Sequence, residues 1–296
     1  METVIIIAGP TASGKTDYAL RLALETGAEI VSADSMQIYR HMDIGTAKPP
    51  LSERGGVRHH MIDVAEPDAR FSVADYQRMA KECLKDITSR KKKAVIVGGT
   101  GLYISSLTNN IKYPVYAADR QFRDRLAGEN QMRGTGAMHA RLADADPQAA
   151  ARIHINDKKR IIRALEVLHA TGMPLSWHES RSRLEAPEYL FKTIGLCIDR
   201  GELYRRINER VDDMFKNGLV DEARFLFERY GAGSAAAQAI GYKELFGYFN
   251  GMCTLDEAAR LIKKATRRYA KRQLTWFRAM PDIIWQNAEY GHGLPV

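Results

Sequence analysis

Residues 9 to 16 of the chain read Gly9-Pro10-Thr11-Ala12-Ser13-Gly14-Lys15-Thr16. They match the pattern GxxxxGK(S/T), in which glycines let backbone N–H groups surround phosphate oxygens, the lysine adds a positive charge and the last hydroxyl binds Mg²⁺. A short apolar run, Val4 to Ala8, precedes the motif, and a helical pattern from Thr16 to Leu24 follows it. The motif therefore stands at a strand-to-helix turn, where it predicts a P-loop for a phosphate or pyrophosphate ligand, with Thr16 as the candidate Mg²⁺ ligand.

Further strand and helix patterns extend the same architecture. Glu29 to Ser32 and Ala94 to Val97 are short runs typical of buried parallel strands, and Phe71 to Ile87 has helical periodicity. A strand pattern returns at Lys192 to Ile198. Strands that alternate with helices imply crossover connections and a parallel sheet.

The middle of the chain differs from the rest, because only helical patterns occur from about Asp119 to Leu175. After the returning strand, the pattern is helical to about Met280. We predict an α/β fold in which residues 1–118 and 190–296 form a P-loop NTPase-like parallel-sheet core with C-terminal basic helices. Residues 119–189 are predicted to form an all-helical insertion domain.

The composition is that of an ordinary globular protein, with 45% hydrophobic and 27% charged residues over 296 positions. No apolar run approaches the roughly 18 residues of a membrane-spanning helix, and the first residues lack the features of a signal peptide. The three cysteines, Cys83, Cys197 and Cys253, lie far apart and form no disulfide or zinc-finger pattern. We therefore expect a cytoplasmic protein with reduced thiols and no membrane segment.

Positive charge is unevenly distributed along the chain. The formal net charge is +8, from 44 Lys and Arg against 36 Asp and Glu, and the stretch from Ala259 to Arg278 contains eight cations and no acid. These cations are Arg260, Lys263, Lys264, Arg267, Arg268, Lys271, Arg272 and Arg278. A second cluster comprises Lys158, Lys159, Arg160 and Arg163. Charge alone leaves two interpretations open, solvated helix faces or contacts with the phosphate backbone of a nucleic acid.

Two acidic residues follow strand patterns and are candidates for chemistry. Asp34 comes after Glu29 to Ser32, so it should stand at the carboxyl edge of the sheet beside the P-loop. Its position is compatible with an acid/base group and with an ordinary turn or helix cap. Asp199 ends a later strand pattern, where it is either a metal-binding acid or a helix cap.

Segments spread over nearly the whole chain resemble, in order, the motifs of the tRNA dimethylallyltransferase family. The matching segments are GPTASGKT (Gly9–Thr16), SADSMQIYR (Ser32–Arg40), DIGTAKP (Asp43–Pro49), FSVADYQ (Phe71–Gln77), GGTGLY (Gly98–Tyr103), NDKKRIIRALEV (Asn156–Val167), RINERVDDM (Arg206–Met214), AIGYKE (Ala239–Glu244) and TRRYAKRQLTWFR (Thr266–Arg278). One departure is Lys159-Arg160, where the family usually has Gln-Arg. The zinc finger of eukaryotic members has no counterpart, since no CxxC is present.

The resemblance implies transfer of a dimethylallyl group from dimethylallyl diphosphate to N6 of the adenosine directly 3′ of the anticodon, in tRNAs that read codons beginning with U. It implies a nucleotide-binding fold with Mg²⁺ as cofactor, and tRNA and dimethylallyl diphosphate as the partners. We expect a cytoplasmic enzyme that acts as a monomer, without an obligate protein partner.

The same resemblance implies residue roles. Asp34 corresponds to the general base, Thr100 to a hydrogen-bonding group near the transferred carbon or the diphosphate, and Arg210 to a cation on the departing diphosphate. The P-loop, Gly9 to Thr16, would bind the diphosphate. The expected tRNA contacts are Asp34, Ser35, Met36, Gln37, Lys159, Arg160, Arg163, Lys263, Arg267 and Lys271.

Three other functions share parts of this pattern. A small-molecule P-loop kinase would explain the P-loop and the sheet, but not the acid-free basic helix. An isopentenyltransferase that acts on free adenine nucleotides would not need the long helical insertion. A non-catalytic RNA-binding protein with a nucleotide switch would leave Asp34, Thr100 and Arg210 without roles.

Overall fold

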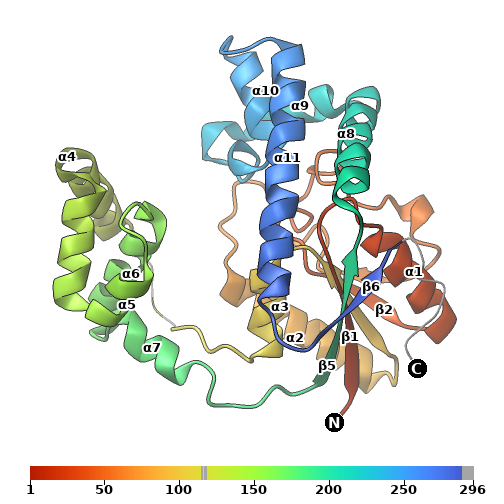
Figure 1. The fold of residues 1–296 in the computed structure, drawn as a ribbon, viewed down its shortest axis with the longest axis horizontal. Coiled ribbons are helices and arrows are strands. Elements are labelled where there is room, and N and C mark those ends of the chain that lie inside the picture. Colours follow the sequence, from red (N-terminus) through yellow and green to blue (C-terminus); the bar gives the residue numbers. More distant parts are fainter. Residues whose placement is uncertain (115, 117–118, 289–296) are drawn as a thin grey trace. The chain divides into compact units, whose positions relative to one another are not determined.

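The computed structural model of the chain describes residues 1–114, 116 and 119–288. It contains a sheet of six parallel strands in the order β3-β2-β4-β1-β5-β6 (Figure 1). The strands are β1 (Thr3–Ala8), β2 (Glu29–Ser32), β3 (His59–His60), β4 (Ala94–Gly98), β5 (Leu190–Cys197) and β6 (Ile283–Asn287). The predicted α/β fold with a parallel sheet is confirmed.

The sequence pattern predicts four of these strands but neither β3 nor β6. Both lie at an edge of the sheet, where pairing with one neighbour defines the strand. β3 has two residues, too few for any periodicity. In β6, Ile284 and Trp285 are exposed, so the strand lacks the buried pattern of the central strands.

Helices cover both faces of the sheet. They are α1 (Lys15–Thr26), α2 (Val73–Ser89) and α3 (Gly101–Thr108). Successive residues of a strand point to opposite faces. Ile7 and Val95 accordingly pack with α1 on one face, whereas Ile6 and Ile96 pack with α2 and α3 on the other. The carboxyl ends of the strands stay uncovered by these helices, and the loops there are free to form a site.

Four α-helices of the described residues follow β5 in sequence. They are α8 (Arg200–Lys216), α9 (Leu219–Tyr230), α10 (Tyr242–Phe249) and α11 (Leu255–Arg278), with short 3₁₀ helices at Leu51–Glu53, Gly231–Gly233 and Ala236–Gln238. Figure 1 shows α8 starting beyond the end of β5, with α11 beside it. The group has its own core, in which Val211, Leu226, Phe246 and Ile262 are buried. α11 also reaches the sheet, because Phe277 packs in the core with α2 and α3.

The chain forms two compact units, residues 1–108 with 188–296 and residues 109–187. The regular elements of the second unit are all helices, α4 (Arg120–Ala145), α5 (Pro147–Arg152), α6 (Lys158–Thr171) and α7 (Leu175–Arg181). The sequence placed the insertion at 119–189. The second unit begins earlier because the side chain of Asn110 donates to the carbonyl of Ala186 at 3.0 Å, and the N–H of Lys112 donates to the carbonyl of Ser182 at 2.8 Å. Within the described residues, no helix is both long and apolar enough to cross a membrane.

Candidate active site

Three loops that follow β1, β4 and β2 meet at the carboxyl edge of the sheet. These strands are neighbours, and parallel pairing brings their carboxyl ends together. The backbone N–H of Ser35 donates to Oγ1 of Thr100 at 3.0 Å, and the N–H of Thr100 donates to the carbonyl of Ala33 at 3.1 Å. The loop that contains Asp34 and the loop that contains Thr100 are therefore joined by direct hydrogen bonds.

A side chain from α11 connects the P-loop to the Thr100 loop. Gln273 is buried, its Oε1 accepts the N–H of Thr11 at 2.9 Å, and its Nε2 donates to the carbonyl of Gly99 at 2.9 Å. A larger residue at position 99 would displace the amide of Gln273, because a Cβ there would lie 2.1 Å from this Nε2. Sequence reasoning missed Gln273, since its partners are 262 and 174 positions away and nothing local marks it.

The N-terminus of α1, which follows the P-loop directly, lies in the same region. Gly14 is the N-cap of α1 with φ of 82°, a left-handed conformation that favours glycine. The first N–H groups of α1 have no preceding helical carbonyl to bond, so this helix end suits an anion. The hydroxyl of Ser13 is buried and has no hydrogen-bond partner in the described part of the chain.

The side chain of Lys15 folds over the P-loop, and its Nζ donates to the carbonyl of Pro10 at 3.2 Å. Burial lowers the pKa of Lys15 to about 8, against the opposing effect of the negative charge of Asp34, and the positive charge of Arg210 lowers it further. These three groups come from the P-loop, the loop after β2 and α8. Asp34 and Arg210 are close enough for their charges to act on Lys15.

We expect the affinity for inorganic pyrophosphate to fall as the pH rises above about 8. Below this pKa the lysine is already charged in the free protein, whereas above it the amine has to take up a proton when the anion binds. Because a bound anion raises the pKa of Lys15, the dissociation constant should rise about tenfold per pH unit in this range. Calorimetric titration on either side of pH 8 measures the effect.

The matched control for this titration is Lys15→Arg, because a guanidinium stays protonated throughout. The ionisation of pyrophosphate itself affects the variant and the wild type equally, so the comparison removes its contribution. The same loss of affinity with pH in Lys15→Arg as in the wild type would contradict the assignment to Lys15.

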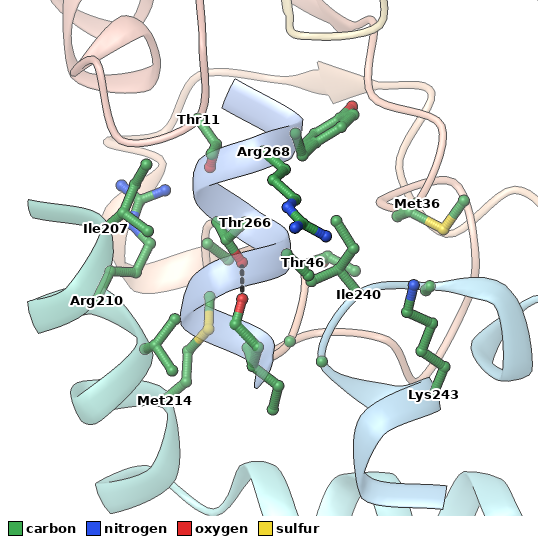
Figure 2. Close-up of a pocket in the computed structure, with 18 of the residues that line it drawn as sticks. Thr11, Met36, Thr46, Ile207, Arg210, Met214, Ile240, Lys243, Thr266 and Arg268 are labelled. Atoms are coloured by element: carbon green, nitrogen blue, oxygen red, sulfur yellow. Dashed lines mark hydrogen bonds between the residues drawn. The ribbon is translucent and has the colours of Figure 1, made fainter. Parts of the chain in front are cut away.

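Three cavities meet around these groups. The inner cavity, of about 420 Å³, is lined by the loop after β2 and by α8 and α11. The vestibule, of about 610 Å³, is lined by the P-loop, the segment around residues 43–53 and α8. The small cavity, of about 40 Å³, has Lys15, Thr16, Asp34 and Arg210 among its lining residues. Figure 2 shows the inner cavity, with Arg210 and Met214 projecting from α8 and Arg268 from α11.

Asp34 forms a turn that fixes one carboxylate oxygen and leaves the other without a donor. Its Oδ1 accepts the backbone N–H groups of Met36 at 2.9 Å and of Gln37 at 3.4 Å. Among the described residues none donates to Oδ2, and Asp34 lines both the inner and the small cavity. The turn-forming role and the acid/base role left open by the sequence are thus both accommodated by this geometry.

Arg210 is a half-buried cation that lines all three cavities. Burial lowers the pKa of its guanidinium, and the charge of Asp17 opposes that effect. Within the part of the chain that the structure describes, it has no ion-pair or hydrogen-bond partner. A buried charge without a partner is costly, and it is what a site for an anionic ligand requires.

The residues beside Lys15 fit a Mg²⁺ ion that takes most of its ligands from phosphate and water. The hydroxyl of Thr16 and the carboxylate of Asp34 both line the small cavity. The described residues contain no group of three or more His, Cys, Asp or Glu side chains that could hold a metal by themselves. Mg²⁺ is commonly bound through one or two protein groups plus substrate phosphates, so this sparse donor set is suited to it.

Besides Asp34, three residues predicted to contact tRNA stand in the loop after β2. Ser35 and Met36 line the inner cavity. The amide of Gln37 is already engaged, because its Oε1 accepts the hydroxyl of Ser32 at 3.2 Å and its Nε2 donates to two carbonyls of residues 46–47 at 3.3 Å. In this structure Gln37 holds two loops together, and it also lines the small cavity.

A carboxylate from α9 fixes the segment that separates the cavities. Glu222 accepts the backbone N–H groups of residues 43 to 45 at 3.0, 2.8 and 3.0 Å and the hydroxyl of Tyr242 at 2.6 Å. The following residue pair, 46–47, lines the inner and the small cavity. Sequence reasoning missed Glu222 as well, because its role depends on contacts between distant elements.

The cations of α11 fall into two groups. Lys263 forms an ion pair at 2.6 Å and Arg267 a hydrogen bond at 2.6 Å, both with side chains of α8, whereas Lys271 is exposed. Arg268 and Arg272, which are one turn apart, line the inner cavity. The sequence pattern located the basic helix but did not identify the two arginines that face the cavity.

The second predicted basic cluster lies at the start of α6. Lys158, Lys159 and Arg160 are exposed, and Arg160 forms an ion pair with the N-cap carboxylate at 3.4 Å. Arg163 lies over the ring of Tyr116, 5.0 Å from its centroid, and burial lowers the pKa of Arg163. Cations at a helix N-terminus oppose the helix dipole, so this arrangement concentrates positive charge at some cost to helix stability.

Asp199, which the sequence left open as a metal ligand or a helix cap, caps α8. Its Oδ1 accepts the N–H groups of Gly201 at 2.7 Å and Glu202 at 3.1 Å, which lowers the pKa of Asp199. It lines none of the three cavities. The structure therefore supports the capping interpretation.

Comparison with known proteins links this geometry to one family. The family model described as IPP transferase matches residues 37–280. The tRNA dimethylallyltransferase of Desulforudis audaxviator is 50% identical over 287 residues, which cover 97% of this chain and 92% of that protein. The tRNA dimethylallyltransferase of Bacillus subtilis is 46% identical over 284 residues, covering 96% and 90%.

Solved structures give the same result. The tRNA isopentenylpyrophosphate transferase of Bacillus halodurans is 42% identical, with a TM-score of 0.72 and coverage of 97% of this chain and 90% of that one. A eukaryotic dimethylallyltransferase described as acting on tRNA is 28% identical, with a TM-score of 0.84 and coverage of 97% and 74%. The sequence match over most of the chain and the shared fold agree, and the chain belongs to the IPP transferase family.

Proposed function

We propose that this chain transfers a dimethylallyl group from dimethylallyl diphosphate to N6 of an adenosine in tRNA, acting as a cytoplasmic monomer. The proposed acceptor is the adenosine directly 3′ of the anticodon, in tRNAs that read codons beginning with U. One observation carries the proposal: a P-loop, the unpaired guanidinium of Arg210 and a free oxygen of Asp34 surround connected cavities. The family and the activities of its named members supply the two substrates.

The first part of the reaction is the departure of diphosphate. The allylic C–O bond breaks, its electron pair leaves with the diphosphate, and positive charge spreads over the five-carbon fragment. The first N–H groups of α1, the ammonium of Lys15 and the guanidinium of Arg210 stabilise the anion where it forms. The hydroxyl of Thr16 would hold a Mg²⁺ ion together with the phosphate oxygens, and the ion would supply further positive charge there.

The second part is attack by N6 of the acceptor. The nitrogen lone pair forms the new N–C bond, and the amine then has to lose a proton. Oδ2 of Asp34 takes this proton, while Oδ1 stays fixed by the two backbone N–H groups of its turn. The hydroxyl oxygen of Thr100 accepts the N–H of Ser35, and its hydroxyl also hydrogen-bonds with Tyr269. Donation from Thr100 to the diphosphate or the carboxylate would replace the contact with Tyr269.

The acceptor base has to leave its stack before it enters the inner cavity, and in a single-stranded loop this costs little. Lys243, Arg268 and Arg272 line this cavity and suit the phosphates on either side of an extruded nucleotide. The exposed cations of α6 and of α11 are suited to the backbone of the stem. Such contacts position the RNA, whereas the loop after β2 lies closest to the base.

The proposal is tested by incubating the wild-type protein with unmodified anticodon stem-loop RNA, Mg²⁺ and dimethylallyl diphosphate, followed by mass analysis of the nucleosides. We expect an adenosine that has gained one five-carbon unit, formed only when the donor is present. Failure of the folded protein to form this nucleoside, together with phosphate transfer from ATP to a small molecule, would replace the proposal with a kinase activity.

A further inference from the structure

Met214 stands at the boundary between the inner cavity and the vestibule. Three residues line both spaces, Ala47, Arg210 and Met214. The first has a small side chain and the second a charged one, so the thioether of Met214 is the largest apolar group at this boundary. Figure 2 shows Met214 projecting from α8 toward the inner cavity, as Arg210 does.

The position of Met214 relative to Arg210 follows from helix geometry. The two residues are four positions apart, so they are neighbours on one face of α8. A group attached to an anion at Arg210 extends along this face, either toward Ile207 or toward Met214. Toward Ile207 the space is limited to the inner cavity, which this residue lines, because Ile207 is 1% exposed and packs with Ala12 and Ala270. On the other side, the half-buried Met214 separates the inner cavity from the larger vestibule.

We propose that Met214 limits the length of the hydrocarbon tail that the donor diphosphate can carry. This inference rests on the proposed function. With the diphosphate on the P-loop and the purine in the inner cavity, a five-carbon tail ends against Met214. A ten-carbon tail has to pass into the vestibule, whose lining is largely charged but includes the apolar residues Ile44, Ala47 and Pro50, and the side chain of Met214 stands at that passage.

The chemical step is the same for both tails. The allylic C–O bond breaks, the diphosphate leaves with the electron pair, the N6–C bond forms, and the amine proton passes to Asp34. Truncating Met214 therefore changes which tail fits and leaves the reacting atoms in place. One methylene in an apolar pocket already changes selectivity by about 10–200-fold, so removing a steric block against five further carbons should have a large effect.

The test compares wild type, Met214→Ala and Ile240→Ala. Each protein is incubated with stem-loop RNA, Mg²⁺ and either dimethylallyl or geranyl diphosphate. The nucleoside products are then identified and quantified by mass spectrometry. We expect wild type to form mainly the five-carbon product, and Met214→Ala to raise the ratio of ten-carbon to five-carbon product by about tenfold or more. Ile240 lines the inner cavity but not the vestibule, so Ile240→Ala should keep the preference of the wild type.

Met214→Leu has a similar side-chain volume and should also keep the wild-type preference. Thermal unfolding checks that each variant is folded, and Met214→Val replaces the alanine variant if the latter is not. A folded Met214→Ala protein that forms only the five-carbon product would overturn the inference. Equal use of both donors by the wild type, or ten-carbon product from Ile240→Ala alone, would overturn it too. If wild type forms no five-carbon product, the proposed function itself has failed, and the inference fails with it.

Discussion

Asp34→Asn should lower the rate of the chemical step by about 10²–10⁴-fold while the donor and the RNA still bind. The amide keeps one oxygen that can accept the N–H groups of Met36 and Gln37, so the turn around residue 34 persists. What disappears is the second carboxylate oxygen, which receives the proton from N6. Single-turnover rates at saturating donor and stem-loop RNA measure this step without the contribution of binding or product release.

Asp199→Asn is the matched control, because Asp199 is also an aspartate at the end of a strand but caps a helix away from the three cavities. It should leave the single-turnover rate near that of the wild type. If Asp34→Asn slows the chemical step less than about tenfold, Asp34 shapes the loop without taking the proton, and the amine has another acceptor.

The features that the sequence predicts correctly depend on local signals. The P-loop pattern and the short apolar strand before it lie within about a dozen residues, and both describe the backbone itself. The parallel sheet follows from the same kind of signal, because the alternation of strands and helices restricts the possible connections. Edge strand β6 lacks such a signal, since its identity comes from pairing with β5.

The arrangement of side chains around the cavities depends on contacts between distant elements. Helical periodicity marks α11 as basic, but whether a cation faces α8 or the inner cavity is decided by packing, which places Lys263 on one side and Arg268 on the other. Gln273 and Glu222 are ordinary polar residues in helical patterns. Their importance follows from hydrogen bonds to loops far away in sequence, and a single sequence does not encode those distances in any local pattern.

Arg210→Met should move activity and stability in opposite directions. We expect kcat/KM for the donor to fall by about 10²–10³-fold, because a cation that meets the developing charge of the diphosphate is lost. The free protein should melt at the wild-type temperature or above it. Arg210 has no ion-pair partner among the described residues, and burial lowers its pKa, so an apolar side chain removes the cost of keeping an unpaired cation out of water.

Thermal unfolding with and without pyrophosphate measures stability and anion binding on the same samples, and steady-state kinetics gives kcat/KM for the donor. Pyrophosphate should raise the melting temperature of the wild type through binding to the folded state, and should raise that of Arg210→Met much less. Arg210→Lys should fall between them, because it keeps a point charge but loses the planar pair of donors. A free Arg210→Met protein that melts well below the wild type would mean that the arginine supports the fold. A more stable but inactive variant would instead mean that the unpaired arginine serves ligand binding and lowers the stability of the free protein, as expected where function and stability compete.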